Sequence, residues 1–428
     1  MASISSFVRL HCSFFFTFSH RAMADEKEPL LRRDAAAMAD TDSYYVSSRD
    51  ASRRIPQTIA HRGHKAAFAE NSMAAFRGAA RVGAHAIETD VRLTADGVAV
   101  ISHDASLKRC FGVDKTVAEC DWAYLSTLRM LRDKDQGMPR LADFFAWLVS
   151  GPGRNGGGED DEEARSRERL WVLLDIKIDD DPRQLMRGIA TALSQTPAGA
   201  VPWEQRILLG CWNAALVEAA TKTLPGFPLA HIGASLSYAR HFLAVPGLAF
   251  NMAQAPLLAP LRGRAFMRAV RAHGRALFVW TVNTERGMEW CIRQNLPPPR
   301  RPARRPGCAS DDSGGGGGGG GGGTGDDNRD PKALAAAATA TVSGPRLIDG
   351  VITDDPELFL AVCRRYEDQL DGTTRPTRPA TARETVGLVM HVLGRQLLFK
   401  LMFVYRRFWL NKLDYLHERE RAPVDKTD

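Results

Sequence analysis

The sequence predicts an α/β fold, a (β/α)8 TIM barrel, on three observations. Short apolar runs alternate with stretches of helical periodicity, which is typical of a parallel sheet whose strands are joined by helices. Polar side chains follow several of these runs, at the strand ends where barrel enzymes carry their chemistry. The chain has 428 residues, a length that accommodates one closed barrel with appendages.

The apolar runs that predict strands are slightly more numerous than a barrel of eight needs, so one of them should lie outside it. In chain order they lead into His61, Glu88, His103 and Asp175, and then comprise residues 206–211, 229–232, 248–251, 276–281 and 350–353. Between the first two, the periodic run from Met73 to Val82 predicts a helix. Asn71 or Ser72 would be its N-cap, and Gly83 would end it.

Three early strands each deliver a side chain that suits proton transfer or metal binding. His61 follows residues 58–60, Glu88 follows residues 86–87, and His103 follows residues 98–101. Because side chains i and i+2 of a strand share a face, Glu88 and Asp90 could hold one divalent cation through hard oxygen ligands. Histidine titrates near neutral pH, so His61 and His103 are the candidate acid and base.

Each of these motifs has an ordinary structural reading when it is taken alone. His-Arg-Gly occurs in turns, Glu-x-Asp is common at solvated strand edges, Lys177 could be an exposed charge, and Trp280 could be a core aromatic. Chance composition would rarely place them together at successive strand ends. Their joint placement favours a metal-assisted phosphodiester site.

The order of the motifs resembles that of the glycerophosphodiester phosphodiesterase family. From about Ile55 to Cys363, the shared motifs are His61-Arg62-Gly63, Glu70-Asn71, Glu88-x-Asp90, His103-Asp104, Leu174 to Lys177, Trp280 to Asn283, and Asp349 to Pro356. Within this family the chain resembles most the fungal phosphatidylglycerol-specific phospholipase C. The resemblance implies a phosphoric diester hydrolase.

The predicted site neutralises the negative charge by which a phosphodiester repels nucleophiles. Glu88, Asp90 and Asp175 would hold a hard divalent metal, Mg²⁺ or Ca²⁺, against a phosphate oxygen. Arg62 and Lys177 would add fixed positive charge at the phosphate. Many family members carry Glu where this chain has Asp175, so the third metal ligand is shorter here.

The remaining predicted residues move protons or contact the glycerol. One of His61 and His103 activates the nucleophile, and the other protonates the leaving oxygen. By resemblance, the first nucleophile is the substrate's own glycerol hydroxyl, which gives a cyclic phosphate that water then opens. Trp280 would form an apolar wall for the glycerol carbons, and Asn283 would contact a hydroxyl group.

Composition limits the partners and the compartment. The net charge of +7 suits an anionic partner, for which anionic lipid is as good a candidate as nucleic acid, and no nucleic-acid motif accompanies the charge. The seven cysteines are odd in number and scattered, so they indicate neither a disulfide framework nor a zinc site. We therefore expect an intracellular protein without a nucleic-acid partner; its oligomeric state is left open.

Three domain-level segments are predicted, with the barrel over residues 55–363. Residues 1–54 form either a disordered or a targeting extension, and translation starting at Met23 or Met38 is an alternative. Two insertions interrupt the barrel, a solvated loop at about 151–169 and a flexible segment at about 296–345 that contains the glycine run 314–323. Residues 364–428 comprise a linker and a membrane-interacting helix.

That C-terminal helix is predicted from an apolar stripe at helical spacing. The stripe consists of Val386, Met390, Leu393, Leu397, Leu401, Val404 and Phe408. A spanning helix is disfavoured because Arg395 and Lys400 would lie in hydrocarbon, at roughly 2.5–3.5 kcal/mol each. An amphipathic helix over 386–412 on an anionic membrane surface fits better, on a mitochondrion, a lipid droplet or the endoplasmic reticulum. The alternative is a helix packed on the barrel.

The predicted function is hydrolysis of phosphatidylglycerol to diacylglycerol and glycerol phosphate. A soluble glycerophosphodiester phosphodiesterase and a non-catalytic lipid-binding barrel are the alternatives. The loop after His103-Asp104 is expected to be brief, without room for the small inserted domain by which many soluble members recognise their substrates. This expectation and the C-terminal helix favour a lipid substrate, and the intact His61, Glu88, Asp90 and His103 argue against a silent barrel.

Overall fold

The computed structural model describes residue 49 and residues 53–151, 159–259, 261–296 and 346–375, with the isolated residues 387, 390, 394 and 401. Of residues 159–162 it describes the backbone alone. The predicted N-terminal extension, the glycine-containing insertion and the C-terminal amphipathic helix therefore lie almost wholly outside the described residues. Within the described part, no helix has the length and apolar character needed to cross a bilayer.

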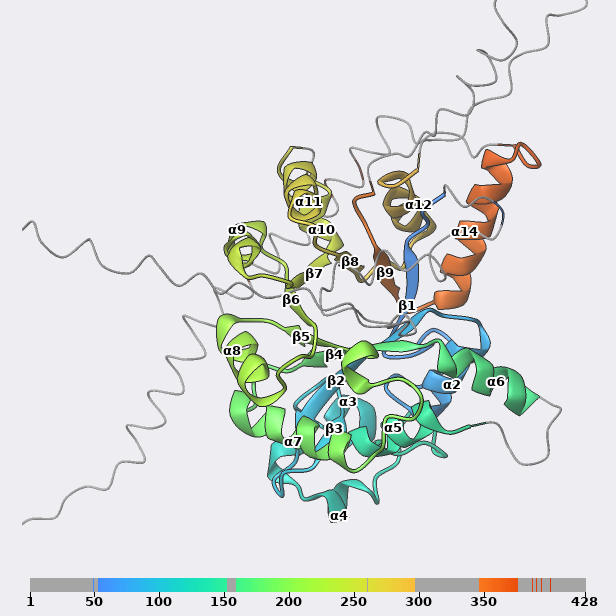
Figure 1. Cartoon of the computed structure of the whole chain (residues 1–428). Coiled ribbons are helices and arrows are strands. Elements are labelled where there is room, and N and C mark those ends of the chain that lie inside the picture. The colour runs from blue at the N-terminus through green and yellow to red at the C-terminus, as the bar shows by residue number, and fades with distance from the viewer. Residues whose placement is uncertain are drawn as a thin grey trace, which may run out of the picture.

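Eight parallel strands close into a barrel, which confirms the predicted fold class. Their order around the barrel is β1, β9, β8, β7, β6, β5, β4, β2, and β2 pairs again with β1. The first and last strands of the chain therefore lie side by side (Figure 1). The barrel strands are β1 (Gln57–His61), β2 (Ala86–Leu93), β4 (Trp171–Ile176), β5 (Ile207–Cys211), β6 (Leu229–Gly233), β7 (Ala249–Ala253), β8 (Leu277–Trp280) and β9 (Gly350–Thr353).

The surplus strand is β3 (Ala99–Ile101), which runs antiparallel to the end of β2 and outside the barrel. It is the strand that leads into His103. The sequence could not identify it as the outsider, because a run of Ala, Val and Ile has the same composition as a barrel strand. His103 therefore reaches the site from an appended strand rather than from the barrel itself.

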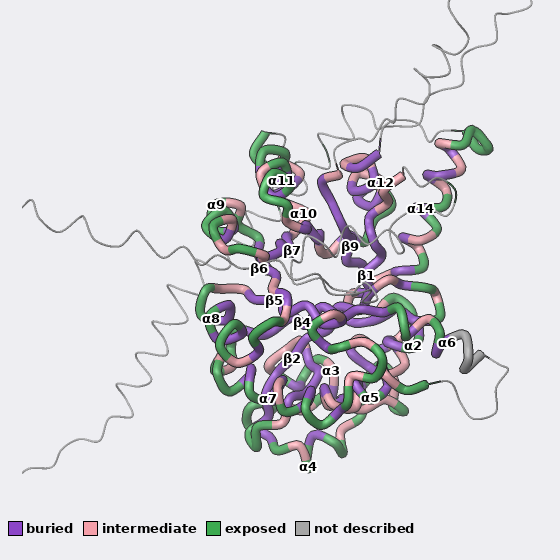
Figure 2. The backbone as a smooth tube through the Cα atoms, viewed as in Figure 1, coloured by how far each residue is buried: buried purple, intermediate pink, exposed green. Residues whose placement is uncertain are grey.

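Helices surround the barrel, and most of them turn a buried face toward it (Figures 1 and 2). The longer ones are α2 (Met73–Arg81), α5 (Leu141–Val149), α6 (Glu159–Glu168), α7 (Pro182–Ser194), α8 (Ala214–Thr223), α9 (Leu236–His241), α11 (Arg262–Ala272), α12 (Glu285–Arg293) and α14 (Pro356–Leu370). The short ones are α3 (Lys108–Phe111), α4 (Trp122–Leu125) and α10 (Gln254–Leu257), with the 3₁₀ turns η2 (Val117–Glu119), η3 (Trp203–Gln205) and η4 (Phe242–Ala244).

The helix predicted over 73–82 is α2, and its cap is Ser72. The Ser72 hydroxyl accepts a hydrogen bond of 3.1 Å from the backbone N–H of Ala75, which satisfies one of the free donors of the first turn. After the helix, Gly83 has a φ of +80°, the left-handed conformation that ends helices. Asn71, the other candidate cap, has a φ of +55° and directs its side chain into the site described below.

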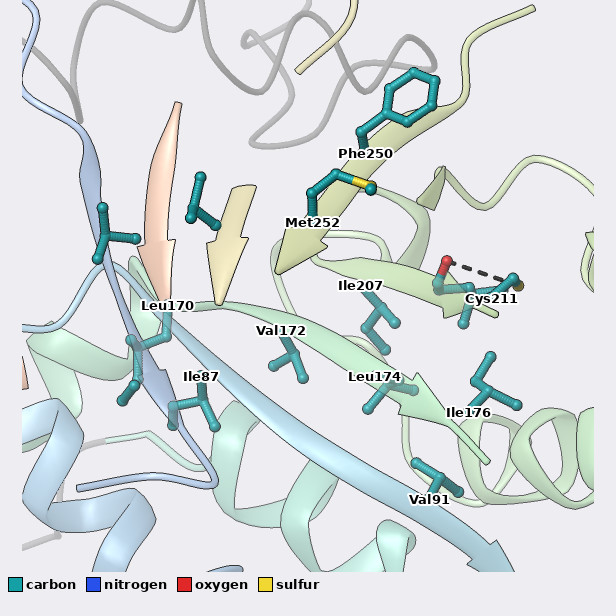
Figure 3. Close-up of a cluster of buried hydrophobic side chains, with 14 of the residues drawn as sticks. Ile87, Val91, Leu170, Val172, Leu174, Ile176, Ile207, Cys211, Phe250 and Met252 are labelled. Carbon is teal, nitrogen blue, oxygen red and sulfur yellow. Dashed lines mark hydrogen bonds between the residues drawn. The ribbon is translucent and has the colours of Figure 1, made fainter. Parts of the chain in front are cut away.

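Strand alternation divides the core into two layers. The larger layer lies between strands and helices and takes Val172, Leu174 and Ile176 from β4 (Figure 3). The smaller layer fills the barrel interior and takes Trp171 and Leu173 from the same strand. Asp175 continues the second set, so the period of two along the strand brings its carboxylate to the carboxyl end of the interior.

The insertion at 151–169 is not a solvated loop throughout, because residues 159–168 form α6. Buried contacts with α5 explain this difference. The Trp147 Nε1–H donates to the Glu163 carboxylate at 3.1 Å, and Arg167 pairs with the same carboxylate at 2.9 Å. The Arg167 guanidinium also lies 5.5 Å from the centre of the Trp147 ring. The charge-rich composition predicted solvation, but a partner on another helix buries these charges in pairs.

The segment after His103 is also larger than expected. Residues 102–140 carry α3, η2 and α4 around a separate cluster of buried apolar side chains, which includes Leu107, Phe111, Val117, Leu125 and Met138. A bridge between Val100 and Arg140 closes the base of this insertion. The expectation of a brief loop is wrong, since residues far apart in the segment pack on one another. The size of this loop therefore gives no argument against a small soluble substrate.

Candidate active site

A cavity of about 110 Å³ opens among the predicted site residues at the carboxyl end of the barrel. Strand register brings the residues together: His61 on β1 pairs with Glu88 on β2, and Asp90 on β2 pairs with Asp175 on β4. The cavity is lined by His61, Arg62, Glu88, His103, Asp175, Trp212, Ile232, Asn251, Trp280, Thr281 and Ile352. Of the predicted site residues, Asp90, Lys177 and Asn283 do not line it.

The three predicted metal ligands form one cluster of carboxylates. Glu88, Asp90 and Asp175 are buried, and an oxygen from each lies within 4.8 Å of the other two. Burial and the charges of Asp90 and Asp175 together raise the pKa of the Glu88 carboxyl. A cluster of hard oxygen donors with an excess of buried negative charge fits a divalent cation. Asp175 reaches the cluster although it is shorter than Glu.

Lys177 contacts this cluster rather than the cavity. Its Nζ lies 2.6 Å from Asp90 Oδ1 and 2.7 Å from Asp175 Oδ2. Burial opposes the charged form of the lysine, but the two carboxylates outweigh that effect and raise the Lys177 pKa. Other side chains hold the same two carboxylates in place. Asn71 donates to Asp90 at 2.7 Å, and the Trp212 indole donates to Asp175 at 2.7 Å. Lys177 thus compensates part of the cluster's charge, where the sequence placed it on the substrate phosphate.

His61 is held by a carboxylate that the sequence analysis left without a role. Asp354, just after β9, lies 2.5 Å from His61 Nδ1 through its Oδ1. Burial lowers the His61 pKa, and the hydrogen bond with Asp354 opposes part of that shift. A carboxylate on Nδ1 keeps the proton of a neutral imidazole there and leaves Nε2 as an acceptor. That Nε2 is 3.9 Å from Glu88. The sequence feature that could have identified Asp354 as a site residue is its position at the end of the last predicted strand.

Asn283 belongs to the support of Asp354. Its Nδ2 donates to Asp354 Oδ2 at 2.9 Å, and its Oδ1 accepts from the Asp354 backbone N–H at 2.9 Å. These bonds leave one oxygen of Asp354 for His61. Asn283 therefore lies beside the site and orients its acid–base pair, where the sequence analysis expected a contact with a substrate hydroxyl.

His103 has an equivalent arrangement on the other side of the cavity. Its Nδ1 lies 2.7 Å from the Oδ1 of its neighbour Asp104. Burial lowers the His103 pKa, while Asp90 and Asp104 raise it in part. Both histidines thus have a carboxylate on Nδ1 and line the cavity, as a general base and a general acid require.

Arg62 contributes positive charge to the cavity from a constrained turn. Its backbone N–H donates to Glu88 O at 2.8 Å, and its Nη1 donates to Glu70 at 2.8 Å. Arg62 has a φ of +58°, and Gly63 has a φ of +78°. A Cβ added to Gly63 would lie 2.7 Å from the Ala75 carbonyl carbon, so only glycine fits there. Such strained backbone is typical of functional sites.

The opposite wall of the cavity is mostly apolar. The rings of Trp212 and Trp280 meet edge to face with centres 5.7 Å apart, and Ile232 and Ile352 complete the wall. The Trp280 indole donates to the backbone oxygen of Asn251 at 3.0 Å. The Asn251 side chain is buried, and among the described residues its carboxamide oxygen has no hydrogen-bond partner. Trp212 and Asn251 were not among the predicted site residues, although both lie at or near the ends of predicted strands.

This arrangement can bind and hydrolyse a phosphodiester. Arg62 attracts the phosphate, while His61 and His103 can each take or give a proton through Nε2. When bound by the carboxylate cluster, a divalent cation supplies further positive charge to a phosphate oxygen. The rings of Trp212 and Trp280 could pack against the carbon atoms of a bound substrate.

Comparisons with known proteins agree with this geometry. Residues 61–297 match the glycerophosphoryl diester phosphodiesterase family. The human protein named lysophospholipase D GDPD1 is 32% identical over 118 residues, covering 25% of this chain and 38% of the relative. Bovine glycerophosphodiester phosphodiesterase 1 is 42% identical over 66 residues, covering 15% of this chain and 19% of the relative. These matches span less than half of either relative's length.

Solved structures resemble this chain at low sequence identity. A glycerophosphoryl diester phosphodiesterase from Silicibacter pomeroyi superposes with a TM-score of 0.50 at 15% identity, covering 80% of this chain and all of that one. A phosphodiesterase from Oleispira antarctica, in complex with sn-glycerol-3-phosphate, superposes with a TM-score of 0.47 at 17% identity, covering 72% of this chain and 97% of that one. The family match covers more than half of the 428 residues. The chain belongs to the glycerophosphoryl diester phosphodiesterase family.

Proposed function

We propose that this enzyme hydrolyses phosphatidylglycerol to diacylglycerol and glycerol phosphate. The observation that carries the proposal is the small cavity with two unlike walls, one charged and one formed by tryptophan and isoleucine. Its volume of about 110 Å³ is well below the roughly 300–1,000 Å³ of sites for drug-sized ligands. A glycerol phosphate headgroup suits such a cavity, and the acyl chains would remain outside it.

In the proposed reaction, the headgroup hydroxyl next to the phosphate attacks the phosphorus. One histidine, His61 or His103, takes the proton of that hydroxyl, and the other gives a proton to the departing diacylglycerol oxygen. The product is a cyclic glycerol phosphate. Water then opens the ring, with the two histidines exchanging their roles, and glycerol phosphate leaves.

Asn251 is our candidate contact for the terminal hydroxyl of the headgroup. A hydroxyl both donates and accepts, so it can pair with either atom of a carboxamide. A half turn of the Asn251 carboxamide exchanges its oxygen and nitrogen, and either one can meet the bound hydroxyl. Asn283 fits this role less well, because it does not line the cavity and its oxygen and nitrogen already hydrogen-bond Thr353 or Asp354.

The test is a comparison of lipids by headgroup, with the products identified. We expect phosphatidylglycerol to yield diacylglycerol and glycerol phosphate, and phosphatidylcholine and phosphatidylethanolamine to react far more slowly. A headgroup lacking the terminal hydroxyl, as in phosphatidyl-1,2-propanediol, should lower kcat/KM roughly tenfold or more, since an unpaired buried polar group costs about 1–3 kcal/mol. Asn251→Leu should remove the difference in kcat/KM between the lipids with the glycerol and the 1,2-propanediol headgroup. A folding defect would lower both rates equally.

Hydrolysis of soluble glycerophosphodiesters alone is the second candidate function, and the compact insertion at 102–140 favours it. In that case glycerophosphoglycerol would be cleaved and phosphatidylglycerol would not. Release of phosphatidic acid instead of diacylglycerol would also contradict the proposal, because the other ester bond of the phosphate would have been broken.

Membrane docking through residues 386–412 completes the proposal. Met390 and Leu401 of the apolar stripe are 63% and 57% exposed, whereas a helix packed on the barrel through that stripe would bury them. The exposure of these two apolar side chains, in a segment whose sequence also carries Arg395 and Lys400, favours an anionic lipid surface.

Truncation after Thr381 tests the docking. We expect hydrolysis of phosphatidylglycerol in vesicles and flotation with anionic liposomes to fall sharply, while hydrolysis of detergent-dispersed short-chain lipid is retained, because docking raises encounter frequency and leaves the chemistry unchanged. A thermal melt serves as the control. Destabilisation with equal loss on both substrates would indicate a helix packed on the barrel, and unchanged vesicle activity would rule out the anchor.

A further inference from the structure

Arg109 joins two parts of the active site without lining the cavity. Its Nη1 and Nη2 donate to the two oxygens of Glu70 at 2.9 and 2.7 Å, and its Nε donates to Asp104 Oδ2 at 2.5 Å. Glu70 also accepts from Arg62, and Asp104 contacts His103 Nδ1. Five residues therefore form one continuous chain, which we call the arginine–carboxylate chain: Arg62, Glu70, Arg109, Asp104 and His103.

We propose that Arg109 is a positioning residue that fixes the His103–Asp104 pair for catalysis. The Asp104 side chain is 28% exposed, and a carboxylate in that position can rotate and bind water unless its second oxygen is held. Arg109 holds Oδ2, which leaves Oδ1 for the histidine. With Nδ1 held as a donor, the Nε2 of His103 stays directed to the substrate phosphate. The proposal requires the phosphodiesterase reaction but not the choice of phosphatidylglycerol as substrate.

The contacts of Arg109 use the planar fork of a guanidinium. Two parallel bonds to one carboxylate and a third to another are possible for arginine and impossible for lysine. Burial alone would raise the Glu70 pKa, but Arg109 and Arg62 hold it at about 2. Glu70 is thus ionised across the neutral range and keeps Arg109 in place. Lys65 adds a weaker contact at 3.9 Å from Glu70.

The position of Arg109 gives the insertion at 102–140 a role in the reaction. Arg109 lies on α3 within the insertion, whereas Glu70 lies in the segment before α2. The pairing therefore ties the insertion to the barrel next to both Arg62 and His103. Arg92 on β2 holds the His103 backbone oxygen through hydrogen bonds of 3.0 and 2.8 Å. The arginine–carboxylate chain adds a constraint on the His103 imidazole.

Arg109→Ala tests the proposal in the full-length protein. We expect kcat to fall roughly 10- to 100-fold, the range seen when partners that orient site residues are removed, with KM changed less than about twofold. The Arg109 side chain is 50% exposed, so free guanidinium at millimolar concentration can enter and should restore part of kcat. Arg109→Lys should lie between the parent and the alanine variant. A merely structural role would not produce guanidinium rescue.

A double variant shows whether Arg109 acts through Asp104. Combining Arg109→Ala with Asp104→Asn should lower kcat little more than Asp104→Asn alone, because contacting residues of one network are not additive. The matched control is Arg140→Ala, since Arg140 pairs with Asp143 at the other end of the insertion and is 42% exposed. We expect that variant to keep its kcat and to show no response to guanidinium.

Each variant is assayed on two substrates, phosphatidylglycerol in detergent micelles and glycerophosphoglycerol. If the parent enzyme hydrolyses glycerophosphoglycerol but not phosphatidylglycerol, the proposed function is contradicted. The role of Arg109 can then still be tested on the soluble diester. Unchanged kcat in Arg109→Ala, strictly multiplicative losses with Asp104→Asn, or an equal loss in Arg140→Ala without rescue would each overturn the positioning role.

Discussion

Replacing His61 or His103 with Ala should lower the rate of phosphodiester hydrolysis by roughly a hundredfold or more. General acid–base catalysis is typically worth 10²- to 10⁴-fold, and both histidines line the cavity with a carboxylate on Nδ1. The measurement is kcat on glycerophosphoglycerol and on phosphatidylglycerol. We expect thermal melts close to that of the parent, because neither side chain belongs to the apolar core.

The control for this result is His273→Ala. His273 lies at the end of α11 and bonds only the Ala269 backbone oxygen at 2.8 Å among the described residues, so its loss should not change kcat. Near-normal turnover in His103→Ala would remove that residue from the mechanism. Near-normal turnover in His61→Ala would remove His61 and its partner Asp354 from the mechanism.

Removal of divalent metal by a chelator should abolish activity, and Mg²⁺ or Ca²⁺ should restore it. Three buried carboxylates hold the proposed ion, so Glu88→Gln and Asp90→Asn should weaken its binding in calorimetry before they lower the melting temperature. Glu88 is the most direct probe, because Lys177 pairs with the other two carboxylates and not with Glu88 in the described structure.

Asp175→Asn tests the third ligand. Asp175 also pairs with Lys177, so its loss has two consequences, and the ion affinity separates them. The matched control is Asp179→Asn. Asp179 lies just after the same strand, and its exposed carboxylate pairs with Arg92. If Asp175→Asn binds the ion as tightly as the parent and the control do, Asp175 is not a ligand and serves only to hold Lys177 and Trp212.

The features predicted correctly from the sequence depend on local regularities. Alternation along a strand decides that Glu88 and Asp90 share a face, and helical spacing with a polar cap decides where α2 begins. The repetition of strand and helix indicated the barrel, and side chains at strand ends indicated the cavity. These properties extend over a few residues, so the order of residues is enough to recognise them.

The errors arose where packing between distant segments decides the outcome. Helix α6 forms because Trp147 accompanies Glu163 and Arg167 into the interior, and the insertion at 102–140 is compact because its apolar residues meet across turns. Composition alone predicted a loop in both places. No local pattern distinguishes a charged segment with buried partners from one that is solvated.

The order of the residues was enough to predict the barrel, the family resemblance and the set of side chains at the strand ends. The partner of each side chain, in contrast, depends on how the chain folds. His61 contacts Asp354, which is 293 positions away, and Asn283 hydrogen-bonds the other oxygen of Asp354. Lys177 contacts Asp90 and Asp175 instead of the cavity. Hydrogen bonds and ion pairs act over a few ångströms, and barrel closure and strand register set which distant residues come within that range.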